Sequence, residues 1–121
     1  MSKPVPKSNP FLLALIDDLK TASRENEAPI WRDVALRLSR PSRVWAEVNL
    51  SRLERHAEDG EVVVIPGKLL GTGRLTKALR ISAFQSSEAA RTLVEAAGGQ
   101  VLAIRDLVKE NPRGSGVRIM G

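Results

Sequence analysis

Residues 60–73 read GEVVVIPGKLLGTG, and this stretch decides the fold. Val62 to Ile65 form a continuous apolar run that is bounded by Gly60 and Pro66. A short apolar run between turn residues is typical of a β-strand buried on both faces, as in parallel sheets. We therefore expect a central strand here.

The chain that follows predicts a crossover unit. Further strands are expected at 78–84 and 101–104, and Ser86 is expected to cap a helix between them that ends at Gly98-Gly99. Strands separated by a helix of roughly ten residues are usually neighbours in one sheet and run in parallel. The second half of the chain is therefore expected to be α/β, with some parallel pairing.

The chain that precedes residue 60 predicts two helices. Asn9 is a suitable cap for a helix that starts at Pro10 and ends near Glu25, and a second helix is expected from Pro29 to about Ser39. One face of the first helix is expected to carry the apolar residues Phe11, Leu12, Leu15, Ile16 and Leu19.

A short strand at 44–48 and a brief helix, capped by Asn49 and ending near Leu53, are expected to follow. The resulting fold class is α/β: a single compact domain, 9–121, with an irregular mixed sheet and flanking helices. Residues 1–8 contain prolines, serines and lysines but no acid, and are expected to form an extended basic arm.

The composition favours a polyanionic partner. The 121 residues include 19 Lys and Arg against 14 Asp and Glu, which gives a formal net charge of +5 and an isoelectric point near 10.2. The absence of cysteine excludes disulfides, thiolate catalysis and the common zinc sites. No apolar run is long enough to cross a bilayer, so we expect a cytoplasmic protein without a membrane partner.

The placement of the charges is more informative than their sum. Residues 65–87 include no acid, and the turn-rich segment 111–121 is also acid-free, whereas most acids fall in or beside predicted helices. Arginine and lysine near glycine suit phosphate groups, because glycine allows close approach and a guanidinium can bind two phosphate oxygens. Any single arginine is equally well explained as a solvated surface charge.

Other motifs favour ordinary structural roles. The glycines of 67–73 do not match a phosphate-binding loop, because Gly67-Lys68 comes first and no Ser or Thr follows the lysine. His56 lacks local catalytic partners, and adjacent carboxylates such as Asp17-Asp18 point in different directions on a helix. Trp31 is expected in the core, while Trp45 is expected to be more open. No catalytic residue, cofactor or metal site is predicted.

The order of these pieces resembles a known family, the archaeal and eukaryotic large-subunit ribosomal protein L18e, with bacterial L15 as its relative. The resemblance covers roughly residues 9–120, and Leu69-Leu70 departs from its usual Val-Leu pair. The segments that carry it are NP at 9–10, IWRDVA at 30–35, AEVN at 46–49, GEVVVIPGKLLGTG at 60–73, FQS at 84–86, GG at 98–99, NP at 111–112 and GVRI at 116–119.

This resemblance implies a structural constituent of the large ribosomal subunit, without catalysis or a small-molecule substrate. Its implied partners are large-subunit ribosomal RNA and neighbouring large-subunit proteins. A DNA-binding or nucleoid module, and behind it a phosphate-handling enzyme, stay open as alternatives. From charge and glycine placement, the expected RNA contacts are Lys3, Lys7, Arg40, Arg43, Arg52, Lys68, Arg74, Lys77, Arg113 and Arg118.

Overall fold

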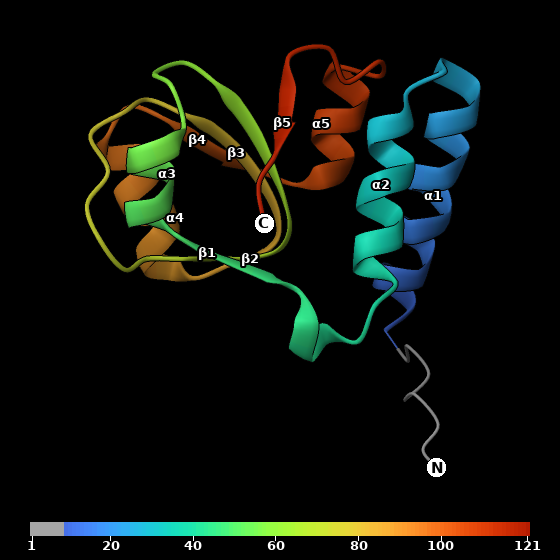
Figure 1. Ribbon diagram of the computed structural model, residues 1–121, viewed down its shortest axis with the longest axis horizontal. Helices are drawn as coiled ribbons and strands as arrows, with labels where there is room; N and C mark the ends of the chain where they lie inside the picture. The colour runs from blue at the N-terminus through green and yellow to red at the C-terminus, as the bar shows by residue number, and fades with distance from the viewer. Residues whose placement is uncertain (1–8) are drawn as a thin grey trace.

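The computed structural model describes residues 9–121, which form one sheet between two layers of helices (Figure 1). The helices are α1 (Pro10–Asn26), α2 (Pro29–Leu38), α3 (Leu50–His56), α4 (Glu88–Ala96) and α5 (Ile104–Glu110). The strands are β1 (Ala46–Asn49), β2 (Val62–Leu70), β3 (Arg80–Ser86), β4 (Gln100–Leu102) and β5 (Val117–Ile119), and the 3₁₀ turn η1 (Ser42–Val44) precedes β1.

The sheet is organised around β2. Its order is β1-β2-β3-β4, and β5 also pairs with β2. Along one edge of β2, β5 pairs with Val62–Val64 and β1 pairs with 67–70. The expected α/β class is confirmed. Among the described strands every pair is parallel, so the mixture of strand directions that we expected does not occur.

The central strand is longer than its apolar run. We expected Val62 to Ile65, but β2 continues through Pro66 to Leu70, because β1 and β3 pair with its second half. The register with β3 shifts between Ile65 and Lys68, which accommodates a proline that has no amide hydrogen to donate. Gly67 is required here, since a Cβ atom would lie 2.2 Å from the carbonyl oxygen of Ala46.

Several boundaries differ from the expectation. Ser87, rather than Ser86, caps α4 by accepting a hydrogen bond from the backbone N–H of Ala90. The third strand ends at Leu102, and helix α5, which the sequence patterns did not predict, begins at Ile104. The strand expected at 44–48 begins at Ala46, after η1.

Two apolar clusters hold the layers together. One joins α1, α2 and α5 to one face of the sheet, and the other joins α3 and α4 to the opposite face. Trp31 is fully buried in the first cluster, as expected, and its indole N–H donates to the carbonyl oxygen of Pro112 over 2.7 Å. The expectation that Phe11 joins the buried face of α1 is wrong: in the first turn of that helix it is 80% exposed.

Candidate nucleic-acid interface

Helix α3 and the glycine-containing loop 71–79 form one structural unit. The loop carries the chain from β2 to its parallel neighbour β3, a crossover that usually contains a helix. Instead, it lies along α3, starting at the helix N-terminus. There the carbonyl oxygen of Thr72 accepts from the backbone N–H of Ser51 over 3.2 Å, and the Ser51 backbone leaves no room for a Cβ at Gly73.

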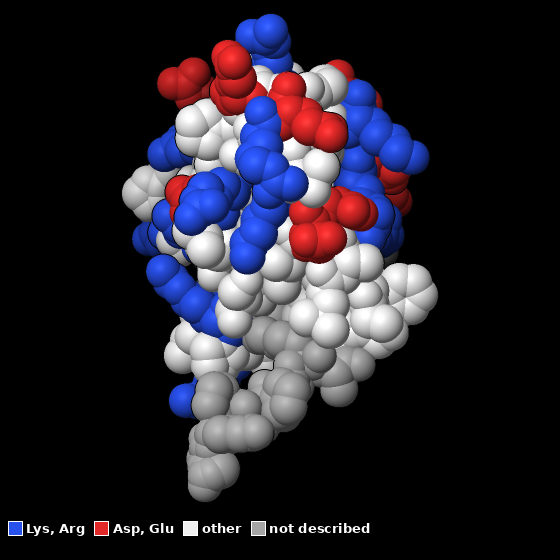
Figure 2. Space-filling view, turned by 90° about the vertical axis from the view of Figure 1, so that its right-hand side faces the viewer, with Lys and Arg blue, Asp and Glu red and all other residues white. Residues whose placement is uncertain are grey.

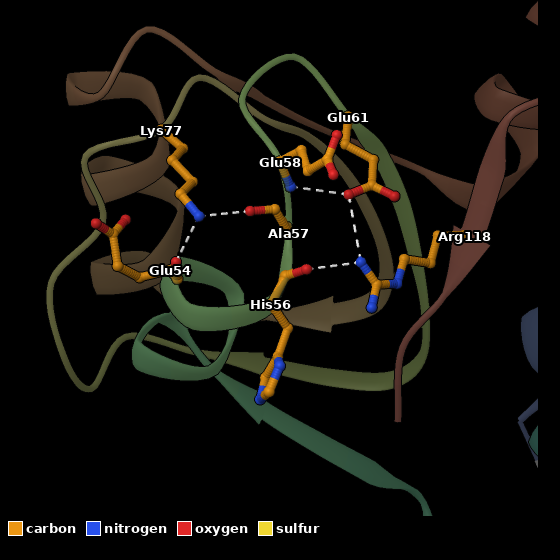
Figure 3. A network of polar contacts seen from close by, with 7 residues as sticks. All are labelled: Glu54, His56, Ala57, Glu58, Glu61, Lys77 and Arg118. Atoms are coloured by element: carbon orange, nitrogen blue, oxygen red, sulfur yellow. Dashed lines mark hydrogen bonds and ion pairs between the residues drawn. The ribbon is translucent and has the colours of Figure 1, made fainter.

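The same loop continues to the other end of α3. The backbone N–H and hydroxyl of Thr76 donate to the Glu54 carboxylate, over 2.9 and 2.7 Å. The Nζ atom of Lys77 donates to the carbonyl oxygens of Glu54 and Ala57, over 2.6 and 2.5 Å (Figure 3). A cation is favourable at a helix C-terminus, where carbonyl oxygens lack intrahelical partners. Loop 71–79 therefore caps both ends of α3.

Asn49 occupies the N-cap position of α3 but does not act as its cap. Its side chain makes no capping hydrogen bond, and its Oδ1 atom is buried without a hydrogen-bond partner among the described residues. The expectation from the sequence is therefore right about the position and wrong about the interaction. The carbonyl oxygen of Thr72, 23 positions along the chain, takes the role that a cap side chain usually has.

Arg118 holds the end of α3 from the other side. From strand β5, its guanidinium donates to the carbonyl oxygen of His56 over 2.7 Å and forms an ion pair with Glu61 at 3.5 Å (Figure 3). Glu61 also accepts from the backbone N–H of Glu58 over 2.9 Å. Two basic residues expected to contact RNA, Lys77 and Arg118, thus donate to the backbone of this junction.

Three expected contact residues lie toward the carboxyl end of the sheet. Lys68 is in β2, directly opposite Glu47 in β1 and Gln85 in β3. Arg52 is exposed on α3, and Arg74 is exposed in the crossover loop. Among residues 9–121, Lys68, Arg52 and Arg74 form no ion pair or hydrogen bond.

The remaining expected residues are distributed elsewhere. Arg40 and Arg43 are exposed in the connection between α2 and β1. Arg113 lies in the turn before β5, which pairs with the first residues of β2, so it is at the opposite end of the sheet from Arg74. Lys3 and Lys7 lie outside the described residues. Within residues 9–121, the structure therefore does not bring the eight described contact residues into one cluster.

Trp45 differs from the expectation. It was expected to be open for stacking, but it is only 9% exposed. Its indole N–H donates to the carbonyl oxygen of Arg40 over 3.0 Å, and its ring meets Phe84 edge to face, with centroids 5.3 Å apart. The flanking arginines suggested exposure, but the hydrogen bond turns the indole inward.

The distribution of acidic and basic side chains differs between parts of the surface. The face over α1 and α2 carries acidic and basic side chains side by side (Figure 2). Arg55 and Arg91 were not among the expected contacts, but they are exposed on α3 and α4 and form no ion pair or hydrogen bond within 9–121. Arg91 lies in a predicted helix and Arg55 lies just beyond one, and neither is next to a glycine or proline.

The Glu54 carboxyl group has a pKa that its surroundings lower. Hydrogen bonds from the backbone and then the hydroxyl of Thr76 lower the pKa of this carboxyl group below its ordinary value, and the charges of Lys77 and Arg74 act in the same direction against a desolvation effect. Within residues 9–121, no group of three acidic or histidine side chains is placed to hold a metal ion, and no helix is long and apolar enough to span a membrane.

Comparison with known proteins gives a consistent result. A family described as ribosomal proteins 50S-L15, 50S-L18e and 60S-L27a matches residues 47–102, which include α3 and the crossover loop. The large ribosomal subunit protein eL18 of Methanoregula boonei is 51% identical over 120 residues, covering 99% of each chain.

The chain belongs to the eL18 family. The eL18 protein of Archaeoglobus fulgidus is 51% identical, covering 94% of this chain and 97% of its own. That of Methanococcus maripaludis is 47% identical, covering 98% of both. The resemblance seen in the sequence is therefore confirmed over nearly the whole chain.

Lys77 and Arg74 are predicted to differ in their effect on stability. Lys77→Ala removes two charge-assisted hydrogen bonds at the C-terminus of α3 and should lower the free energy of unfolding by about 1–3 kcal/mol. Arg74→Ala, in the same loop but without a hydrogen bond, should leave it within about 0.5 kcal/mol. Urea unfolding followed by circular dichroism measures both. Equal losses in the two variants would contradict a capping role for Lys77.

Glu54 predicts a pH dependence of stability. Because its pKa is lower in the folded protein, its carboxylate stabilises the fold fully above the unfolded glutamate pKa of about 4.3, and this contribution disappears as the pH falls through the folded value. Glu54→Gln cannot titrate. The difference in unfolding free energy between the original protein and Glu54→Gln should therefore shrink between pH 6 and about pH 3. A constant difference would argue against this role.

Proposed function

We propose that this chain is a structural constituent of the large ribosomal subunit and binds large-subunit ribosomal RNA. The observation that supports this most strongly is the similarity to eL18 proteins over nearly the full length of both chains, at 47–51% identity in the three relatives above. The family is one of ribosomal proteins, which is not an enzyme class. The location that follows is the ribosome, in the cytoplasm.

The proposed contacts are basic side chains at the two ends of the sheet. Arg52, Lys68 and Arg74 would meet phosphates at the carboxyl end, and Arg113 would do so at the amino end. Arg40 and Arg43 would act from the connection before β1, and Lys3 and Lys7 from the N-terminal segment. Since Arg52, Lys68 and Arg74 lie at one end of the sheet and Arg113 at the other, they suit RNA segments that converge around the protein better than one straight duplex.

Lys77 and Arg118 would contribute in a different way. Their donors bind the backbone at the end of α3, so we propose that they position the surface that carries Arg52 and Arg74. An RNA ligand that reads shape requires its phosphate contacts at fixed separations. Holding α3 and the crossover loop as one unit provides that fixed separation before RNA is bound.

The first test of this function is co-sedimentation. The full chain with an affinity tag, expressed in an archaeal host, should migrate with large subunits on a sucrose gradient and leave them only at high salt. Neighbouring large-subunit proteins should then be recovered from the same fractions. Accumulation of the chain only in the soluble fractions at low salt would overturn the proposal.

A second prediction concerns salt and Arg74. Binding of the purified chain to protein-free large-subunit ribosomal RNA should weaken as salt rises, with a slope of about 0.7–0.9 per phosphate contact in a plot of log affinity against log salt. Arg74→Gln should reduce both the affinity and the slope, the latter by about one contact. Arg24→Gln, in the last turn of α1, is the control and should change neither. Filter binding at several salt concentrations measures both quantities.

A further inference from the structure

A hollow outside the sites described above lies where α1, β3, α4, β4 and α5 meet. Its volume is about 250 Å³, and its lining includes Phe11 of α1, Phe84 of β3, Arg91 of α4 and Arg105 of α5. The remaining lining residues are aliphatic or small, and none is acidic. The hollow thus combines an apolar floor and aromatic rings with two guanidinium groups.

The backbone that carries Phe11 and the ring of Phe84 are held by other residues of the protein. The backbone N–H of Phe11 donates to the Oδ1 atom of Asn9 over 2.9 Å, so the first turn of α1 is capped and its position is fixed. The ring of Phe11 is nevertheless 80% exposed, the largest exposure among the large apolar residues described. Phe84 packs edge to face with Trp45, at 5.3 Å between centroids. Fixing the backbone of Phe11 and the ring of Phe84 in advance avoids part of the entropic cost of binding.

The charges around the hollow favour an anionic ligand. Arg91 is exposed and forms no ion pair or hydrogen bond within 9–121. Arg105 forms an ion pair with Asp18, which offsets part of its charge and holds its guanidinium at the rim. A ligand with a planar apolar part and a nearby negative charge fits this arrangement, and a nucleotide has both.

The size of the hollow indicates how such a nucleotide would be presented. It is somewhat smaller than pockets for drug-sized ligands, which have about 300–1,000 Å³, so it suits a single base. Stacking of one base on an aromatic ring raises affinity by only about ten- to a hundredfold, which is too little to retain a free nucleotide. The base must therefore belong to an RNA that other contacts already hold.

We propose that this hollow binds one unpaired base of an RNA, which stacks on Phe11 while Arg91 contacts an adjacent phosphate. The proposal rests on the function proposed above, because it requires RNA bound elsewhere on the protein. Its location is consistent with that function: Phe84 immediately precedes Gln85, which lies opposite Lys68 in the sheet. The hollow therefore adjoins the carboxyl end of the sheet, where basic contacts were proposed.

The test compares Phe11→Ala with Leu13→Ala. Both side chains are exposed on α1, by 80% and 48%, so neither change should affect folding. Only Phe11 lines the hollow. The probe is protein-free large-subunit ribosomal RNA from Archaeoglobus fulgidus. Phe11→Ala should bind about tenfold more weakly or worse, with an unchanged salt slope, whereas Leu13→Ala should bind within about twofold of the original protein. Arg91→Gln should weaken binding and lower the salt slope by about one contact.

The outcomes separate this proposal from the proposed function. If the original protein does not bind this RNA, the proposed function fails. If it binds and Phe11→Ala binds equally well, only the stacking proposal is overturned. Equal weakening by Leu13→Ala would also overturn it, because that result indicates a broad apolar contact with another surface.

Nuclear magnetic resonance provides an independent readout. The chain has two phenylalanines and no tyrosine, and both phenylalanines line the hollow, so ¹³C-labelled phenylalanine reports on this site alone. Addition of the RNA should shift both ring signals through the ring current of the base. Signals that stay in place with RNA, but move when residues 1–8 are deleted, would show that the protein's own N-terminal segment covers the hollow and would overturn the proposal.

Discussion

The capping of α3 by the β2–β3 crossover is the interaction on which the surface of this protein depends. A helix of seven residues is too short to be stable alone, since few of its backbone groups have intrahelical partners. A carbonyl oxygen at Thr72 and an ammonium group at Lys77 supply partners at its two ends. The loop has no helix of its own, and its hydrogen bonds to α3 fix its conformation. Helix and loop thus stabilise each other, and neither could be replaced independently.

This constraint divides the basic residues into two groups that their net charge does not distinguish. Lys77 and Arg118 use their donors on backbone carbonyl oxygens, so they determine the geometry of the surface. Arg52 and Arg74 lie on the elements that are held in this way and have no such partners within 9–121. A phosphate gains most from a charge that is not already neutralised, so the second group is better suited to binding. The basic residues of the acid-free segment 65–87 therefore have two roles. Lys77 stabilises the local structure, whereas Arg74 is exposed to solvent.

The sequence predicted the parts of this fold that local patterns determine. The first helix followed from its cap at Asn9 and its apolar spacing, and the second followed from apolar spacing alone. The central strand followed from the apolar run at Val62–Ile65. The missing information was tertiary. The sequence could not indicate that Asn49 makes no capping hydrogen bond, because the acceptor that replaces its side chain comes from Thr72. The inward orientation of Trp45 depends in the same way on a backbone group, the carbonyl oxygen of Arg40.

The proposed contacts also differ in which features of an RNA they can distinguish. Phosphate contacts act over several ångströms and are screened by salt, so they attract RNA and fix its orientation without distinguishing one sequence from another. Stacking on an exposed ring acts only at contact and requires a base that is not already paired, which makes it sensitive to local RNA structure. The unit of α3 and the crossover loop carries the exposed residues Arg52 and Arg74. Together with a hollow that accepts one base, it would recognise a fold of RNA in which an unpaired nucleotide lies at a fixed distance from converging phosphates. Neither feature alone distinguishes such a fold from an ordinary duplex.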